Sequence, residues 1–283
     1  MNVLAFDIET VPDVEAGRRL LDLGDLDDDG VVRAMQANRR EQTGGRDFLP
    51  PHLHRIVAIS VGLRQGERFR VWSLGEASAG EAELVQRFFD GIEKFQPDLV
   101  SWNGTGFDLP VLHYRALLHG VAAARYWETG DSIQPFRWNN YLNRFHWRHL
   151  DLMDVLAGFQ GRASARLEEI AIMLGLPGKL GMHGSLVWDR FHAGDMAAIR
   201  NYCEIDVLNT YLVFLRFQLT RGQLSHEEYL EETVQVRRFL EEHQDQTHFR
   251  EFLAGWTPRE IHQAEMSNQD KRGDGKGDGE AQG

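Results

Sequence analysis

The chain has little cysteine, no excess of positive charge and no long apolar run. Its 283 residues include one cysteine, Cys203, which excludes an internal disulfide and indicates a reducing compartment. Acidic residues outnumber basic ones by 43 to 31, a net charge of −12 that argues against bulk attraction of polyanions. The first apolar run has no basic segment ahead of it and is soon interrupted by acids, so we expect neither a signal peptide nor a membrane span. We therefore expect a soluble, cytoplasmic protein.

Length and hydrophobic content predict one large folded domain, alone or with appendages. A chain of 283 residues with 42% hydrophobic composition is sufficient for a sizeable core. The C-terminal stretch is rich in Gly, Asp, Lys and Gln, which predicts a disordered tail over residues 266–283.

Four acidic residues and one tyrosine stand where regular secondary structure brings them together. Asp7 and Glu9 lie two apart at the end of an apolar run, NVLAFDIE, so a strand places both side chains on one face. Tyr202 and Asp206 lie four apart in a helical stretch and share a helix face. Asp108 follows a second apolar strand, DLVSW, across the loop NGTG. Three distant elements can therefore direct four carboxylates to one point.

A cluster of carboxylates predicts a bound cation. Like charges raise each other's pKa and destabilise the fold unless positive charge neutralises them. Oxygen ligands without cysteine or histidine suit magnesium or manganese. Simpler interpretations exist for single residues, because Asp7 and Glu9 could end a strand in solvent and Asp108 could cap the following helix. Asp206 could be a surface charge, although its apolar neighbours favour a partner.

The three motifs together resemble those of the DEDD 3′–5′ exonucleases of the ribonuclease-H-like superfamily, in the tyrosine-bearing branch. The first motif is D-x-E-T at 7–10, the second is N-x3-F-D at 103–108, and the third is Y-x3-D at 202–206. The chain looks most similar to the proofreading domains of family-B DNA polymerases and to stand-alone bacterial relatives of those domains. Residues 1–217 fit that pattern in order and spacing.

The resemblance implies an α/β fold, a ribonuclease-H-like mixed β-sheet flanked by helices, and catalysis with two divalent ions, Mg²⁺ or Mn²⁺. By that likeness Asp7 bridges both ions, and Glu9 and Asp206 hold the ion that carries the attacking water. Asp108 supports the other ion. Tyr202 orients the water, because a neutral tyrosine with a pKa near ~10 is no strong base at pH 7.

Substrate contacts follow from the same likeness. Thr10, Asn103 and Phe107 occupy the positions that touch the 3′-terminal nucleotides in the resembled family. Asn103 could instead cap its own Asn-Gly turn, and Phe107 could be a core residue. Lys179 could contact a phosphate or be an exposed loop lysine.

The expected activity is a 3′–5′ exonuclease on single-stranded DNA with a free 3′ end, releasing 5′-nucleoside monophosphates. The same site on RNA and an inactive nucleic-acid-binding relative are the alternatives, and no sequence feature identifies a protein partner. An aspartate after the first strand is also typical of haloacid-dehalogenase-type phosphatases, but these need a second aspartate where this chain has Glu9. The acidic net charge predicts weak, transient substrate binding with a shallow salt dependence.

The expected organisation is an exonuclease domain over residues 1–220, a helical extension over 221–265 and the tail. The domain carries a partly helical insertion at 11–52. Its element order is strand, hairpin around Gln65, helix, strand and helix, followed by a last strand near Asp151. Asp151 could help the metal cluster or, as we expect, cap the helix that begins near Met153.

The segment 125–149 has the most unusual composition in the chain. Seven aromatic residues alternate with four arginines and two histidines. Aromatic platforms beside guanidinium groups hold unpaired bases without reading their sequence, so the segment is a candidate strand contact. The alternative is that Trp127, Trp138 and Trp147 are core or interface residues.

Overall fold

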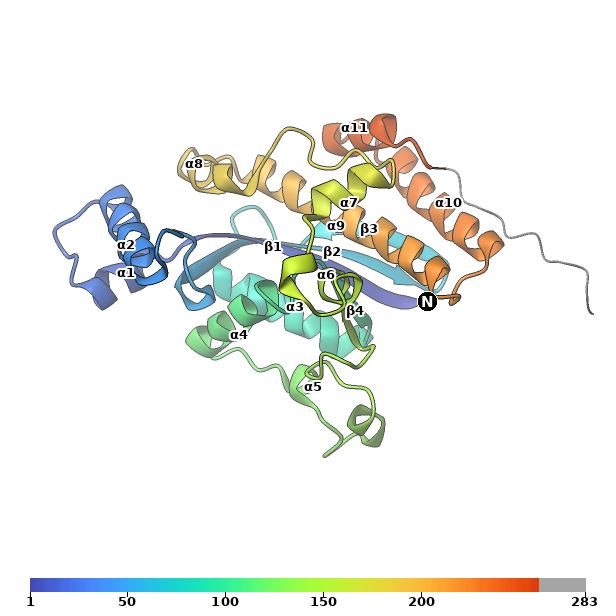
Figure 1. Ribbon diagram of the computed structural model, residues 1–283, viewed down its shortest axis with the longest axis horizontal. Coiled ribbons are helices and arrows are strands. Elements are labelled where there is room, and N and C mark those ends of the chain that lie inside the picture. The colour runs from blue at the N-terminus through green and yellow to red at the C-terminus, as the bar shows by residue number, and fades with distance from the viewer. Residues whose placement is uncertain (260–283) are drawn as a thin grey trace, which may run out of the picture.

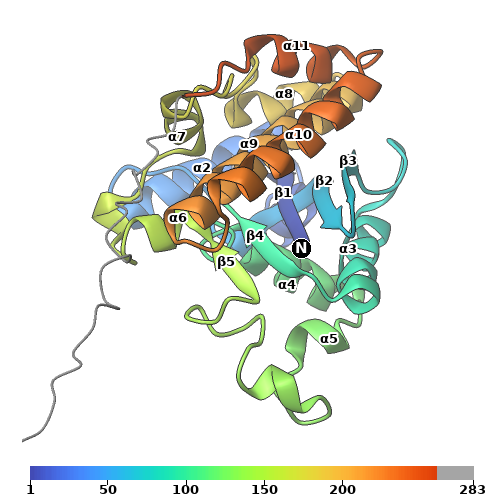
Figure 2. The same ribbon diagram turned by 90° about the vertical axis from the view of Figure 1, so that its right-hand side faces the viewer.

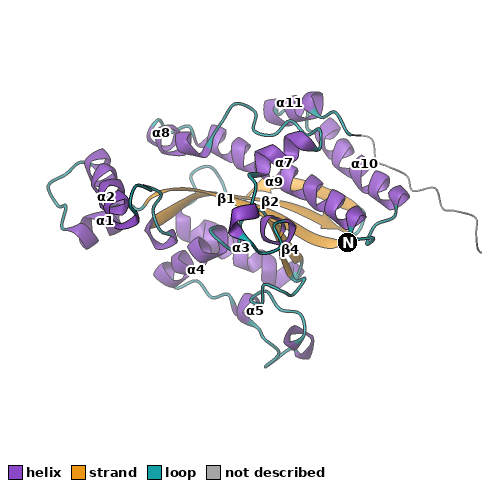
Figure 3. Ribbon diagram, viewed as in Figure 1, coloured by secondary structure: helices purple, strands orange, loops and turns teal. Residues whose placement is uncertain are grey.

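A mixed five-stranded sheet forms the centre of the computed structural model, which describes residues 1–259 (Figures 1 and 3). The strand order is β3-β2-β1-β4-β5. The strands are β1 (Asn2–Pro12), β2 (His54–Gln65), β3 (Arg68–Ser73), β4 (Asp98–Ser101) and β5 (His149–Asp151). β1 pairs antiparallel with β2 and parallel with β4, and β4 pairs parallel with β5. The predicted α/β fold with a ribonuclease-H-like mixed sheet is confirmed.

Helices cover both faces of the sheet (Figure 2). The longer helices are α1 (Val14–Leu21), α2 (Asp28–Thr43), α3 (Glu81–Phe95), α4 (Asp108–His119), α9 (Met196–Thr220), α10 (His226–Glu242) and α11 (Thr247–Gly255). The shorter ones are α5 (Ala124–Trp127), α6 (Leu152–Leu156), α7 (Leu167–Met173) and α8 (Val187–His192). Single 3₁₀ turns are η1 (Pro51–Leu53), η2 (Gln134–Arg137), η3 (Gly161–Ala163) and η4 (Gly184–Leu186). No helix within residues 1–259 is long and apolar enough to cross a membrane.

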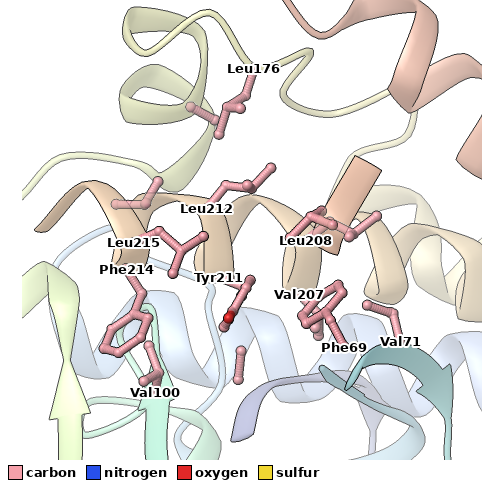
Figure 4. Close-up of a cluster of buried hydrophobic side chains, with 14 of the residues drawn as sticks. Phe69, Val71, Val100, Leu176, Val207, Leu208, Tyr211, Leu212, Phe214 and Leu215 are labelled. Atoms are coloured by element: carbon pink, nitrogen blue, oxygen red, sulfur yellow. The ribbon is translucent and has the colours of Figure 1, made fainter. Parts of the chain in front are cut away.

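The helix α9 lies across one face of the sheet and is buried on nearly all sides along its middle turns. Val207 and Tyr211 face Phe69 and Val71 of β3 in the core shown in Figure 4. A helix with no solvated face is expected to be largely apolar, which explains why apolar residues predominate between Ile205 and Leu215. The same core takes in residues of α10 and α11 as far as Trp256: α10 contacts β3 and α9, and α11 contacts α9 and α10.

A second core lies on the opposite face of the sheet, under α3 and α4. α3 presents Phe88, Phe89 and Ile92 to the strand residues Leu4 and Phe6. The helix ends at Phe95, just before Pro97, as the sequence predicts. Helices therefore cover both faces of the sheet.

The hairpin and the insertion agree with their sequence patterns. β2 and β3 are joined through Gly66, whose φ of +59° explains the glycine at this turn. The insertion 11–52 carries α1 and α2, whose own small core is formed by Val31, Met35 and Leu49. The expected tail at 266–283 lies outside the described residues.

The register of β1 and β2 shifts directly after Glu9. Glu9 pairs with Ala58 but Thr10 pairs with Ile56, so β2 contributes one extra residue, Val57. Such bulges bend and twist a strand locally and are common beside active sites. The irregularity lies directly beside Glu9, and β1 stays paired with β2 as far as Pro12.

Candidate active site

A cleft of about 530 Å³ opens beside residues 7–9 of β1 and after the carboxyl end of β4, beneath α9. Five residues of the three sequence motifs line it together with Asn103 and Phe107. The five are Asp7, Glu9, Asp108, Tyr202 and Asp206. The remaining lining residues are Ile8, Trp102, Met153, Ser164, Ala165, Arg166, Leu167, Glu168, Glu169, Lys179 and His183. The structure thus brings together residues separated by about two hundred positions in the sequence.

The first motif occupies one face of β1. Asp7 is half-buried and Glu9 is buried, and carboxylate oxygens of both lie within 4.8 Å of each other and of Cys203 Sγ. The Cys203 thiol donates to the Asp7 backbone oxygen at 3.3 Å and lies 3.5 Å from Asp7 Oδ2. Burial and the charge of Asp7 raise the pKa of this thiol well above its usual value, so it is a hydrogen-bond donor rather than a thiolate ligand.

The second motif sits in a tight loop after β4. Asn103 adopts a left-handed φ of +65°, and its carbonyl accepts hydrogen bonds from the amides of Gly106 and Phe107, both at 3.0 Å. A Cβ on Gly104 would lie 2.2 Å from Ser101 Oγ, so only glycine fits there. Asp108 is the first residue of α4 rather than its N-cap, which is Phe107, so the capping interpretation of Asp108 is wrong.

Asp151 holds this loop in place. Its carboxylate accepts the backbone amides of Asn103 and Thr105, both at 2.9 Å, and those of Met153 and Asp154 at 3.1 and 3.4 Å. The predicted cap of the helix near Met153 is confirmed. The same side chain also orients the second motif, a role that the sequence pattern did not indicate.

The third motif and Lys179 form one polar group on the α9 side of the cleft. The Lys179 ammonium donates to the Tyr202 hydroxyl and lies 3.6 Å from Asp206 Oδ2. Oδ1 of Asp206 is buried without a hydrogen-bond partner among the described residues. Lys179 lies in a loop that is held against α9 by a hydrogen bond. The side-chain amide of Asn209 donates to the Gly178 carbonyl at 3.1 Å. Lys179 is therefore not an exposed loop lysine.

The electrostatics of the cleft are unfavourable without a cation. Burial first, and then the charges of the neighbouring carboxylates, raise the pKa of Asp7 well above its usual value. Burial also raises the pKa of Glu9, and it raises that of Asp108 to about 7. For Asp206 burial raises the pKa while Lys179 opposes it. Four such groups cannot all be ionised together unless positive charge is supplied.

The donor set fits a hard divalent cation. The four carboxylates offer oxygen ligands. Oδ1 of Asp206 is a hydrogen-bond acceptor that has no donor among the described residues. Burying an unpaired carboxylate oxygen is costly, which makes a ligand at this position the natural explanation.

The remaining predicted residues lie at or beside the cleft. Asn103 and Phe107 line it, and the Phe107 ring stands edge-on to His54 at 4.9 Å. Thr10 lies outside the lining, and its Oγ1 is hydrogen-bonded to His54 Nδ1 at 2.9 Å. Glu168 and His183 line the cleft although no sequence motif singled them out.

The aromatic segment 125–149 contributes nothing to the lining of the cleft. Its tyrosines and Phe136 are buried in the core under α3 and α4. Trp127, Trp138 and Trp147 are 49%, 78% and 47% exposed, so the interpretation of these three as core residues is wrong.

The fold and the acidic cleft define a ribonuclease-H-like protein of the exonuclease class. A family model described as "Predicted 3'-5' exonuclease related to the exonuclease domain of PolB" matches residues 46–256, and the chain belongs to this family. The matched range includes Asp108, Tyr202 and Asp206, whereas Asp7 and Glu9 precede it. No curated protein matches the chain.

Proposed function

We propose that the protein is a metal-dependent 3′–5′ exonuclease that hydrolyses phosphodiester bonds at the 3′ end of single-stranded DNA and releases 5′-nucleoside monophosphates. Family membership supports the exonuclease activity. The observation that carries the proposal is the convergence of Asp7, Glu9, Asp108 and Asp206 in one cleft, with a buried Asp206 oxygen that lacks a partner.

In this proposal the four carboxylates hold two divalent ions, Mg²⁺ or Mn²⁺. Bound ions of this kind stabilise negative charge on the reacting phosphate and lower the pKa of water. The carboxylates are pre-positioned for this task by β1, α4 and α9, three rigid elements of the core.

Tyr202 orients the attacking water and keeps its own proton. Burial and the charges of Asp206 and Glu9 raise the pKa of the phenol, so it is not a general base. Because Lys179 donates to the hydroxyl oxygen, the phenolic hydrogen is left to point toward another acceptor.

Lys179 supplies positive charge next to the reacting phosphate. Its ammonium has three hydrogens, so it can donate to Tyr202 and still face a phosphate oxygen. Asn103 and Phe107 also line the cleft, where an amide and an aromatic side chain can meet the terminal nucleotide.

The experiment is a time course on 5′-labelled single-stranded DNA and on RNA of the same sequence, with Mg²⁺ or Mn²⁺. We expect a ladder that shortens from the 3′ end, faster on DNA, and no products from Asp7→Ala at unchanged thermal stability or better. The proposal fails if the wild type cleaves neither substrate, or if Asp7→Ala cleaves at the wild-type rate. Faster cleavage of RNA would reassign the substrate and keep the chemistry.

A further inference from the structure

Exposed aromatic rings and arginines gather at the β5 edge of the sheet, outside the cleft. We call this group the aromatic edge and define it by Arg144, Phe145, Trp147, Phe159 and Arg221. Phe145 is 69% exposed, Trp147 47% and Phe159 38%. Large aromatic side chains normally bury most of their surface, so a group of them in solvent indicates an interaction site.

The rings are ordered by each other and by guanidinium groups. Phe145 and Phe159 pack edge to face with centroids 5.1 Å apart. The Arg144 guanidinium carbon lies 4.8 Å from the centroid of Phe159, and that of Arg221 lies 3.7 Å from the centroid of Trp147. Alternating aromatic and guanidinium planes are the arrangement on which unpaired bases stack.

Phe159 is held at the surface by an unusual backbone. Its φ is +59°, directly after Gly158 with the same φ, and its amide donates to the Asp154 carbonyl at 2.7 Å. A left-handed conformation is unfavourable for a bulky residue. The conformation keeps the ring beside Phe145 and outside the hydrophobic cores of the described residues. The ring therefore adds little hydrophobic stabilisation to offset the unfavourable backbone.

The aromatic edge has one guanidinium group that no carboxylate of the described residues neutralises, in a chain whose net charge is −12. The Asp151 carboxylate accepts hydrogen bonds from backbone amides, and Asp154 forms an ion pair with Arg144 at 3.0 Å. Arg221 has no ion pair with a carboxylate within residues 1–259. The edge is therefore complementary to a phosphate backbone.

The edge and the cleft are linked by one short segment of chain. Met153 and residues 164–166 line the cleft, and Phe159 lies between them in sequence. Phe159 lies six positions after Met153, which limits the distance between their Cα atoms to at most about 22 Å. A strand with a rise of about 3.4 Å per nucleotide therefore needs at most roughly six nucleotides to pass from the cleft to Phe159. Figure 2 shows α6, which begins this segment, beside β5 at the sheet edge.

We propose that the aromatic edge binds the single-stranded segment on the 5′ side of the nucleotide held in the cleft. The inference rests on the proposed function, since it assumes that a 3′ end enters the cleft. Unpaired bases expose the faces that Phe145, Trp147 and Phe159 can stack on, whereas a duplex hides them. Binding at the aromatic edge therefore depends on the length of the strand and on its being single-stranded, and not on its base sequence.

The test compares wild type with Phe145→Ala and Arg221→Gln. Trp127→Ala is the matched control, because Trp127 is a similarly exposed ring of the same segment that packs on Tyr126 and His113 instead. Binding is measured by fluorescence anisotropy on 20-nucleotide and three-nucleotide oligothymidines with a 3′-terminal phosphorothioate that slows hydrolysis.

We expect Phe145→Ala to raise Kd for the 20-mer roughly five- to hundred-fold, the range for losing a base–aromatic stack. Arg221→Gln lowers the slope of log K against log salt by about one. Both changes weaken binding of the three-nucleotide oligomer less than binding of the 20-mer, because the shorter oligomer spans only about 10 Å. Trp127→Ala leaves both values unchanged.

Four results overturn the inference. They are an unchanged Kd in Phe145→Ala, an equal loss on the three-nucleotide oligomer, an equal loss in Trp127→Ala, or wild-type binding as tight to a 20-base-pair duplex as to the single strand. The last result would point to phosphate tracking of a duplex instead.

Hydrolysis of the p-nitrophenyl ester of thymidine 5′-monophosphate separates this inference from the proposed function. The ester is small enough to occupy the cleft alone. Turnover of the ester with no effect of Phe145→Ala on the 20-mer overturns the edge and keeps the exonuclease. No turnover by wild type, with binding of the 20-mer lost in Phe145→Ala, overturns the exonuclease and keeps the edge.

Discussion

The Lys179 ammonium donates a hydrogen bond to the Tyr202 hydroxyl and at the same time lies 3.6 Å from Oδ2 of Asp206. One lysine thus fixes the orientation of the phenol and offsets part of the negative charge of the cleft. It comes from the loop after α7, twenty-three residues before Tyr202. Its position connects the loop to the third motif and makes it the most informative residue outside the motifs.

Replacing Lys179 with methionine separates its two roles. We expect kcat to fall roughly ten- to hundred-fold because the phenol loses its orienting donor, with a smaller rise in KM. Lys179→Arg should retain a larger share of kcat, since a cation remains. Lys94→Met, at a lysine of α3 outside the cleft, is the control for the loss of one charge. A change in KM alone would assign Lys179 to phosphate binding.

Removing the hydroxyl in Tyr202→Phe should lower kcat roughly ten- to hundred-fold and leave measurable activity. Because the pKa of Tyr202 is raised, its proton is present throughout the working pH range. The pH–rate profiles of wild type and variant should therefore have the same shape. A limb of the wild-type profile that disappears in Tyr202→Phe would show that the phenol titrates and acts as a base.

Asp151→Ala tests the support of the second motif. The variant leaves the amides of Asn103 and Thr105 without an acceptor, so we expect a loss of about 1–3 kcal/mol in the free energy of unfolding and a lower kcat. Asp27→Ala removes an N-cap of α2 in the insertion and should cost about 1 kcal/mol with kcat unchanged. Urea titrations and initial rates on both variants check this. Unchanged kcat in Asp151→Ala would limit Asp151 to capping.

The stability of the metal-free protein should depend on pH through Asp108. Its pKa rises from 3.8 to about 7 on folding, so the folded state binds more protons than the unfolded state in between. The free energy of unfolding then falls as pH rises from about 4 to 7, by at most about 4 kcal/mol.

Two histidines make the free energy of unfolding depend on pH in the opposite direction. Burial lowers the pKa of His113 and of His149 to about 4, so their contribution is lost as pH falls below their usual value. The contribution of Asp108 is therefore the difference in the free energy of unfolding between wild type and Asp108→Asn at each pH. It is measured by urea unfolding in EDTA at several pH values. Equal pH dependence in the two proteins would contradict the raised pKa.

Local periodicity was enough to predict two pairs of residues that line the cleft. Alternation in a strand places Asp7 with Glu9, and four-residue spacing in a helix places Tyr202 with Asp206. Both relationships are set by backbone geometry within one element. The sheet order then follows from packing apolar strands between two helical layers, which the hydrophobic pattern also records.

Residues in irregular loops could not be placed in this way. Lys179 reaches the cleft because Asn209 of α9 binds the Gly178 carbonyl, a contact across thirty-one positions that no local pattern encodes. Composition likewise identified the segment 125–149 but not its position. That segment enters β5 at the strand's amino end, where the Tyr141 hydroxyl donates to the Pro97 carbonyl, while the cleft lies at the carboxyl end.

The central claim is that the buried carboxylates form a binding site for divalent cations. Calorimetric titration of Mn²⁺ into the metal-free protein at pH 6.5 tests it most directly, beside Asp206→Asn and the exposed control Asp25→Asn. We predict binding of two ions by wild type with release of protons, because raised carboxyl pKa values leave protons to displace. Asp206→Asn should weaken binding at least ten-fold, whereas Asp25→Asn should match wild type. Absence of Mn²⁺ binding in wild type, or equal binding by Asp206→Asn, would contradict the account.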